Sequence, residues 1–275
     1  MVSNYPTAKY YFREFIMEGN RLIGIIGAMP EEVDGIVHLL TEREEFTQGM
    51  RTYYKGKLNA IPTIVVFSRW GKVAAATTVT ALITEFKITE LIFTGVAGAI
   101  HTDLNVGDIV IGKRFIQHDM DARPLMKKHE IPLLGKTYLD SDDDHINIAL
   151  TAVQEILSTN KLQNAIGQQT LTEFNITKPK VVVGEIASGD KFFSNAVDKQ
   201  TLLQELPDTL CVEMEGAAVA QVCFEYEIPF TIIRTISDAA DDSAHIDFTS
   251  FLSKVSSLYS VEIIKSLYKT FEKNV

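Results

Sequence analysis

The chain has few cysteines, no long hydrophobic run and no run of basic residues. Among its 275 residues are two cysteines, Cys211 and Cys223, both in apolar surroundings, which is typical of buried thiols in a reducing compartment such as the cytoplasm. No segment approaches the roughly eighteen uninterrupted apolar residues of a transmembrane helix. The formal net charge is −10, and no segment is rich in lysine and arginine. We therefore expect neither a membrane nor a nucleic acid among its partners.

Motifs of several common enzyme classes are absent as well. The first predicted helix does not open with GxGxxG, and the chain has neither a phosphate-binding loop with its lysine nor a GxSxG motif. The six histidines are scattered, and no His or Cys pair has the spacing of metal ligands, so we expect no metal. Acid–base chemistry by carboxylates remains.

Short apolar segments alternate with helical patterns along most of the chain. Apolar, β-branched runs predict strands at 22–28, 90–100, 106–112, 180–188, 209–214 and 229–237, with two more over 52–68. Apolar residues at helical spacing predict helices from Pro30 and over 71–86, 142–158, 215–226 and 248–272. The alternation predicts a single three-layer α/β/α domain with a central mixed, largely parallel sheet.

Two segments lie outside this alternation. Residues 1–20 lack the apolar core and cleavage site of a secretory signal, and we expect an N-terminal extension there, followed by one domain over 21–275. Residues 113–140 contain prolines and show no period, which predicts a long loop. Long loops inside compact domains are usually functional or lie at interfaces.

Two adjacent glutamates, Glu31 and Glu32, stand where the first strand passes into the first helix. One interpretation is structural, because carboxylates in the first helical turn complement the helix dipole. The other is that one of them points into a cleft and acts as a base. Four other strand ends also carry polar or glycine-rich turns: TGVAG (94–98), SGDKFF (188–193), VEMEG (212–216) and RTISD (234–238). Helix capping alone does not explain five such tips at one sheet edge, so they predict an active site.

The ordered motifs identify a family resemblance. IGIIGAMPEEV, GKVAAA, TGVAGAI, VGDIV, SGDKFF, VEMEGAAVAQVC and PFTIIRTISDAAD, from about residue 21 to the end, resemble the 5′-methylthioadenosine/S-adenosylhomocysteine nucleosidases of the nucleoside phosphorylase/hydrolase superfamily. The resemblance implies hydrolysis of an N-glycosidic bond, with release of adenine, in nucleoside catabolism and methionine salvage. It also implies a small-molecule nucleoside substrate, no metal or organic cofactor, and a homodimer.

Matching positions imply residue roles. Glu32 would be the general base that activates water, and Asp238 the general acid that protonates N7 of the leaving adenine. The resemblance places the other matching residues against the substrate: Glu215 on the ribose hydroxyls, Met214 on the sugar, Phe192 and Phe193 on the adenine, Arg234 near the water, Ser237 near the acid, Phe248 at the 5′-thioalkyl group, and Met29, Trp70, Val96 and Gly98 in the pocket wall.

The chemistry of the reaction suits a pair of carboxyl groups. Cleavage of an N-glycosidic bond passes through an oxocarbenium-like sugar, adenine leaves poorly as an anion, and water is a weak nucleophile. An acid and a base contribute about 10²–10⁴-fold each, and they must hold opposite protonation states. Glu32, at a helix N-terminus, is expected to be ionised, whereas burial would keep Asp238 protonated.

Two motifs depart from the family pattern. SRWGK (68–72) stands where the family commonly has SGIGK, and TGVAGA (94–99) where it has TGSAGG. Trp70 therefore either lines the 5′-pocket or turns outward and packs beneath the long loop. Relative to the family pattern, Val96 replaces a residue with a hydroxyl near the sugar, and Arg69 adds a positive charge next to the site. Preference among methylthioadenosine, adenosylhomocysteine, deoxyadenosine and futalosine-type nucleosides stays open.

Two other functions compete. A phosphorylase would need basic residues around phosphate, and the carboxylates at Glu31 and Glu32 would repel that anion. A non-catalytic nucleoside-binding protein would need no acid–base pair. Finally, QHDMDARPLM (117–126) corresponds to a segment that reaches the partner's site in proteins that the chain resembles, which predicts a homodimer with shared active sites.

Overall fold

Four parallel strands form the centre of the molecule. The structure, a computed structural model, describes residues 21–242 and 244–273; the expected extension over 1–20 lies outside them. The strands are β1 (Ile23–Gly27), β4 (Ile61–Phe67), β5 (Glu90–Ala99) and β10 (Phe230–Asp238), adjacent in the order β4-β1-β5-β10. Both faces of these strands are covered, which explains why apolar and β-branched residues predominate in their sequences. Their carboxyl ends therefore meet at one edge of the sheet.

The sheet closes on itself beyond β5. The other strands of this part are β6 (Ile109–Gln117), β8 (Val181–Ser188) and β9 (Thr209–Glu213). β10 pairs antiparallel with β6, β6 and β8 pair in parallel, β8 and β9 pair in parallel, and β9 returns antiparallel to the end of β5. Five strands thus form a small barrel, while β1, β4 and the two strands beyond them extend from β5 as an open wing. The predicted mixed sheet is confirmed, and its partial closure brings several strand ends together.

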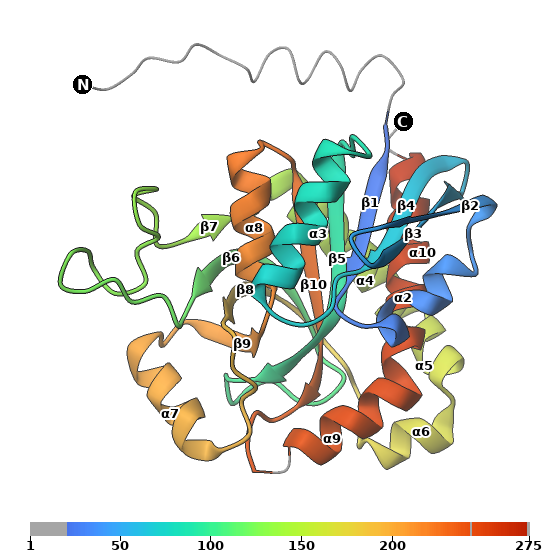
Figure 1. Cartoon of the computed structure of the whole chain (residues 1–275). Helices are drawn as coiled ribbons and strands as arrows, with labels where there is room; N and C mark the ends of the chain where they lie inside the picture. The colour runs from blue at the N-terminus through green and yellow to red at the C-terminus, as the bar shows by residue number, and fades with distance from the viewer. Residues whose placement is uncertain (1–20, 243, 274–275) are drawn as a thin grey trace.

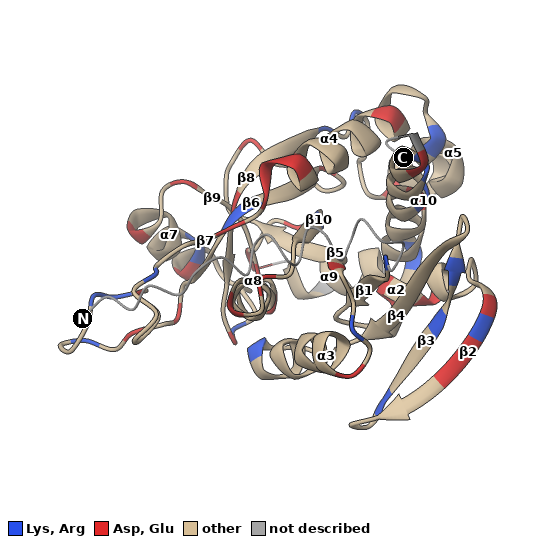
Figure 2. Cartoon of the chain, turned by 90° about the horizontal axis from the view of Figure 1, so that it is seen from above, with Lys and Arg blue, Asp and Glu red and all other residues tan. Residues whose placement is uncertain are grey.

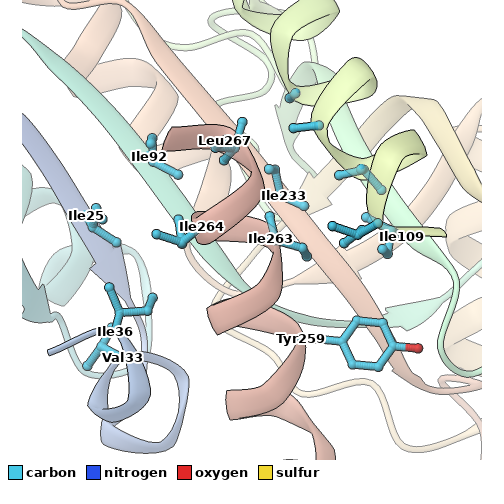
Figure 3. Close-up of a cluster of buried hydrophobic side chains, with 14 of the residues drawn as sticks. Ile25, Val33, Ile36, Ile92, Ile109, Ile233, Tyr259, Ile263, Ile264 and Leu267 are labelled. Carbon is cyan, nitrogen blue, oxygen red and sulfur yellow. The ribbon is translucent and has the colours of Figure 1, made fainter. Parts of the chain in front are cut away.

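Helices cover both faces of the sheet, as the three-layer prediction requires. Figure 2 shows α3 (Lys72–Thr84) and α8 (Gly216–Glu225) on one side, with α4 (Asp143–Ser158) and α10 (Ser257–Lys273) on the other. On the second side, α2 (Pro30–Val37) also packs against α10. The core there consists of interlocking aliphatic side chains from strands and helices, with Tyr259 at one end (Figure 3).

Several elements differ from the sequence prediction. β6 continues to Gln117, so the prediction of a loop from 113 is wrong over its first residues. The terminal helix begins earlier than predicted, as α9 (Ala244–Phe251), followed by a π-helical turn, η1 (Leu252–Ser256), and then α10. The elements not predicted at all are β2 (Thr41–Gln48), the short β7 (Leu139–Asp140), α5 (Lys161–Ile166), α6 (Gln168–Glu173) and α7 (Ala196–Glu205).

The predicted pair of strands over 52–68 is present as β3 (Arg51–Leu58) and β4, joined at Asn59 and Ala60. β2 pairs with β3 at the outer edge of the wing (Figure 1). Every residue of β2 is exposed, and its sequence TEREEFTQ carries four charges. Charged side chains protect an edge strand from pairing with other chains. None of the described helices is both long and apolar enough to cross a membrane.

Candidate active site

A pocket opens where β1, β5, β8, β9 and β10 end. Its empty space is about 560 Å³, part of which is open to solvent. The residues that line it come from all five strand ends and from two further segments: Ala28, Met29, Glu32, Trp70, Val96, Ala97, Gly98, Lys191, Phe192, Phe193, Val212, Glu213, Met214, Glu215, Ser237, Asp238 and Phe248. Segments far apart in the sequence thus share one cavity because their strands share one sheet edge.

Glu32 is buried at the base of this pocket, with 2% of its surface exposed. Its Oε2 accepts hydrogen bonds from the backbone N–H groups of Ala28 at 2.6 Å and Met29 at 3.1 Å. Its Oε1 accepts one from the N–H of Val96 at 3.2 Å. Burial nevertheless raises the pKa of Glu32 from 4.5 to about 7, against the opposing effects of Arg234 and these N–H donors. The expectation that the helix N-terminus keeps Glu32 ionised is therefore wrong, because desolvation outweighs it.

Two glycines of TGVAGA leave room for the two carboxyl groups. A Cβ at Gly95 would lie 2.8 Å from Oε1 of Glu32, and a Cβ at Gly98 would lie 2.9 Å from Oδ1 of Asp238. Both glycines lie in β5 and face β10, where Gly98 pairs with Asp238 after an irregularity in the register. β5 therefore leaves room for the carboxyl groups of Glu32 and Asp238.

Asp238 ends β10 and is buried, with 3% exposed. Its Oδ2 accepts a hydrogen bond from the Ser237 hydroxyl at 2.8 Å, and its Oδ1 accepts one from the N–H of Ala240 at 2.8 Å. Burial raises the pKa of Asp238, more than these two hydrogen bonds lower it. The predicted direction for Asp238 is thus confirmed, since desolvation favours the protonated carboxyl.

Glu213, which lines the pocket, forms a buried ion pair with Arg234, which does not. Nη2 of Arg234 lies 2.7 Å from Oε2 of Glu213, and the two side chains are 1% and 4% exposed. The guanidinium also lies 3.8 Å from the centroid of the Phe93 ring. Glu213 accepts further hydrogen bonds from the Ser188 hydroxyl and from the N–H of Gly216. The pair therefore fixes the turn between β9 and α8.

Glu215 follows on that turn and points back toward α3. Its Oε1 accepts a hydrogen bond from the N–H of Gly71 at 2.8 Å. Burial, and then the negative charge of Glu213, raise the pKa of Glu215 to about 8. Glu32, Glu215 and Asp238 are thus three pocket carboxyl groups biased toward the protonated form.

Three aromatic side chains form the outer wall of the pocket. The ring of Phe248 meets Trp70 edge to face, with centroids 6.0 Å apart, and meets Phe192 with centroids 5.5 Å apart. Trp70 is 53% exposed and Phe192 36% exposed, whereas Phe193 is buried. Trp70 thus lines the pocket with part of its indole, as the first interpretation of its position predicted, and leaves the rest in solvent.

The sequence and the structure both relate the chain to known proteins. The family model described as "Phosphorylase superfamily" matches residues 22–263. A 5′-methylthioadenosine/S-adenosylhomocysteine nucleosidase of Staphylococcus carnosus is 33% identical over 250 residues, which are 90% of this chain and all of that protein. A Staphylococcus aureus protein of the same name is 35% identical over 89% of this chain and 99% of its own length. The chain belongs to the methylthioadenosine/S-adenosylhomocysteine nucleosidase family.

Solved structures agree with this membership. A Neisseria meningitidis nucleosidase of this family, in complex with methylthio-immucillin-A, has a TM-score of 0.79 and 29% identity, over 91% of this chain and 99% of that one. Futalosine hydrolase of Helicobacter pylori has a TM-score of 0.75 and 31% identity, over 90% of this chain and 97% of its own. The fold and the resemblance predicted from the motifs are confirmed.

Most residues that the nucleosidase resemblance selects lie together in the pocket. The exception is Arg234, which does not line the pocket. Its guanidinium pairs with Glu213, lies over the ring of Phe93 and donates hydrogen bonds to the carbonyls of Phe93 and Ile233. The lining residues that sequence reasoning missed are Ala28, Ala97, Lys191, Val212 and Glu213. Each of them lies inside a motif quoted above, within two residues of one that was selected, so their place in these motifs was the signal that could have identified them. Among the described residues, no group of three or more His, Cys, Asp or Glu side chains is arranged to hold a metal ion.

Proposed function

We propose that this chain hydrolyses the N-glycosidic bond of 5′-methylthioadenosine, S-adenosylhomocysteine or both, releasing adenine and the 5′-thioribose product. The observation that carries the proposal is the pair of buried carboxyl groups, Glu32 and Asp238, in one pocket at the ends of β1 and β10. Membership of the nucleosidase family supports the substrate class. The product would enter nucleoside catabolism and methionine salvage.

The pKa values suit the proposed division of labour. With its pKa at about 7, Glu32 is partly ionised near neutral pH and still basic enough to take a proton from water. Asp238, whose pKa is raised, would keep the proton that it delivers to N7 of adenine. As the C–N bond breaks, its electrons pass to the purine, and water bonds to the anomeric carbon. Glu215 would hold the ribose hydroxyls, while Phe192 would stack on the adenine.

The other proposed binding roles follow the same placement. Met29, Val96, Gly98 and Met214 would surround the sugar and base, and Ser237 would orient the Asp238 carboxyl through their hydrogen bond. Phe193 would pair with the purine edge through its backbone. Trp70 and Phe248 would face the 5′-substituent. For Arg234 we propose an indirect role, because its positive charge lowers the pKa of Glu32 from outside the pocket.

Phosphorolysis fits the pocket poorly. Of the described residues that line it, four carry carboxyl groups and one, Lys191, is basic and is paired with Asp198 at 2.7 Å. Arg69, the cation that could have favoured phosphate, donates instead to the carbonyl of Met50 at 2.8 Å and does not line the pocket. The described lining residues therefore offer phosphate no unpaired cation, whereas the ionised form of Glu32 would stabilise a sugar that develops positive charge.

A futalosine-type nucleoside is the second candidate substrate, because a futalosine hydrolase is among the similar solved structures. Adenine or hypoxanthine release should be measured from methylthioadenosine, adenosylhomocysteine, deoxyadenosine and futalosine, with and without phosphate. We expect phosphate-independent release of adenine from a thioadenosine substrate. Intact methylthioadenosine with the purified protein, or strict dependence on phosphate, would contradict the proposal.

For the assembly, we propose a homodimer in which residues 117–126 approach the partner's pocket. Leu125 in this segment is 88% exposed. A nearby groove is lined by residues 131–134 and 224–227, including Leu133, which is 94% exposed, and Phe224, which is 42% exposed. Apolar side chains this exposed are typical of interfaces. Light scattering that finds a fully active monomer would refute the dimer.

A further inference from the structure

We propose that Lys72 is a positioning residue for the nucleoside pocket, because it binds together three separate loops that shape it. The inference rests on the proposed function. The first loop, residues 68–72, carries Trp70 and ends at the first residue of α3. The second, residues 117–121, begins at the last residue of β6, and the third, residues 188–193, begins at the last residue of β8 and carries Phe192 and Phe193. The resemblance assigned no role to Lys72, and its side chain does not line the pocket.

The contacts of Lys72 form a closed triangle. Its Nζ lies 2.6 Å from Oδ1 of Asp119, and the other oxygen of Asp119 accepts a hydrogen bond from the N–H of Asp190 at 2.9 Å. Oδ1 of Asp190 in turn accepts a hydrogen bond from the N–H of Lys72 at 2.8 Å. Nζ also donates to Oε1 of Gln117 at 3.1 Å. Movement of any one loop would therefore break contacts with both of the others.

The position of Lys72 at the start of its helix would be unfavourable without the carboxylate of Asp119. Lys72 is the first residue of α3, where the helix dipole disfavours a positive charge. Asp119 offsets that disadvantage. Although partial burial would raise the pKa of Asp119, hydrogen bonds from Lys72 and Asp190 hold it below its ordinary value. With the two side chains only 17% and 30% exposed, the pair is partly shielded from solvent.

The neighbouring glycine extends the triangle to the sugar side of the pocket. Gly71 donates its N–H to Glu215, directly beside the N–H that Lys72 donates to Asp190. The φ of Gly71 is +90°, and a Cβ at this position would lie 2.9 Å from Oδ1 of Asp190, so both its conformation and its surroundings require glycine. Two consecutive N–H groups at the start of α3 thus hold the carboxyl groups of Glu215 and Asp190, which come from two different segments around the pocket.

The segment after β6 also supports the adenine side through packing. His118 donates its N–H to the carbonyl of Ser188 at 3.0 Å, and its ring lies where a Cβ on Gly189 would come within 2.3 Å. The same ring meets Phe193 edge to face, with centroids 5.2 Å apart. Since Asp119 is the next residue, the Lys72–Asp119 contact holds this support in place.

Loss of the triangle should weaken ground-state and transition-state binding together, because it leaves Glu32 and Asp238 in place. We therefore expect Lys72→Met to raise KM for methylthioadenosine about tenfold with kcat changed less than about twofold. Kd for adenine should rise by the same factor. Trp70, the single tryptophan of the chain, lines the pocket, so its fluorescence should change when adenine binds. Lys72→Arg should restore most of the affinity.

A double-mutant cycle separates this role from general destabilisation. If the triangle acts as a unit, Lys72→Met combined with Asp119→Asn should raise KM no more than about twofold beyond Lys72→Met alone. Lys265→Met is the matched control, because Lys265 forms an ion pair with Glu262 on α10, remote from the pocket. Its KM should equal that of the wild type.

Three results would overturn the inference: an unchanged KM and adenine Kd in Lys72→Met, a loss confined to kcat, or fully additive effects in the double variant. A wild type that releases no adenine from any nucleoside would instead contradict the proposed function. In that case adenine binding, followed by Trp70 emission, still tests the role of Lys72.

Discussion

Two buried glutamates at opposite ends of the central sheet have pKa values shifted in opposite directions. Glu32 follows β1 at the carboxyl end, and Glu90 begins β5 at the amino end, where it is 7% exposed. Glu90 is bonded by Arg21 and lies 3.7 Å from Nε2 of His145, and these partners lower its pKa despite burial. Among the described residues, the hydrogen-bond donors to Glu32 are backbone N–H groups, and burial raises its pKa to about 7.

This difference in pKa distinguishes a glutamate that stabilises the fold from one that serves the proposed reaction. A buried carboxylate with cationic partners in contact stays ionised and ties segments together: Glu90 joins the chain before β1 to the start of α4. A buried carboxyl without a cation in contact is costly when ionised. Such a group is retained where its proton is used, which is why strongly shifted pKa values indicate active sites. The predictions below test this division, from the largest expected effect to the smallest.

Removing proton transfer at the carboxyl end should have the largest effect. Glu32→Gln and Asp238→Asn keep the shape of each side chain, so the fold should remain, while adenine release should fall by at least ~10²-fold in each variant. Initial rates on methylthioadenosine and thermal unfolding of the same samples check this. Either variant retaining more than about a tenth of the wild-type rate would refute the role of that residue.

The equivalent change at the amino end should affect stability alone. Glu90→Gln leaves Arg21 and His145 without their shared carboxylate, and we expect a loss of about 3 kcal/mol in the free energy of unfolding, with kcat within about twofold of wild type. Urea denaturation measures it. Glu42→Gln is the control, because the Glu42–Lys57 pair is exposed and should contribute less than about 1 kcal/mol. Equal losses in both variants would contradict the comparison.

The two glutamates should also respond oppositely to pH. The folded state keeps the Glu32 proton up to a pKa of about 7, against 4.5 ordinarily, so its stabilisation is full below about 4.5 and is lost as pH rises through 7. Glu90, with a lowered pKa, stabilises above its ordinary pKa and loses this as pH falls through its folded-state value.

Glu32→Gln should therefore gain stability relative to wild type by about 2 kcal/mol between roughly pH 5 and pH 8. Urea denaturation of both proteins across this range measures the change. In wild type, kcat/KM should rise with pH through about 7 as Glu32 ionises. A stability difference independent of pH would mean that the Glu32 pKa is not raised.

A change in the pocket wall should have the smallest effect. Trp70 presents a broad apolar face toward the outer pocket, so a compact 5′-methylthio group should be favoured over the homocysteine conjugate. Trp70→Ile should narrow that preference about threefold to tenfold, with the rate on methylthioadenosine nearly unchanged and no loss of stability. The ratio of kcat/KM values for the two substrates checks it, and an unchanged ratio would exclude Trp70 from the specificity site.

Sequence patterns predicted the elements that repeat a simple rule. β1, β5 and β10 are buried runs rich in apolar and β-branched residues, and α4 and α10 show regular apolar spacing, so their positions were largely correct. The polar strand tips also predicted that Glu32 and Asp238 would share a pocket, since parallel strands end at one edge. In contrast, β2 has the composition of an exposed loop, and only its pairing with β3 makes it a strand.

What the sequence determined by itself was the order of strands and helices and the motif residues at their ends, because local periodicity and residue type carry that information. Tertiary structure decided the surroundings of the charged side chains, and with them their pairing and their pKa values. Arg234 appears in a site motif, yet its charge is turned inward to Glu213, and Glu32 sits at a helix N-terminus, yet burial governs its pKa. Desolvation and pairing depend on which distant segments pack around a group, and here the closure of β5, β9, β8, β6 and β10 into a barrel set those neighbours.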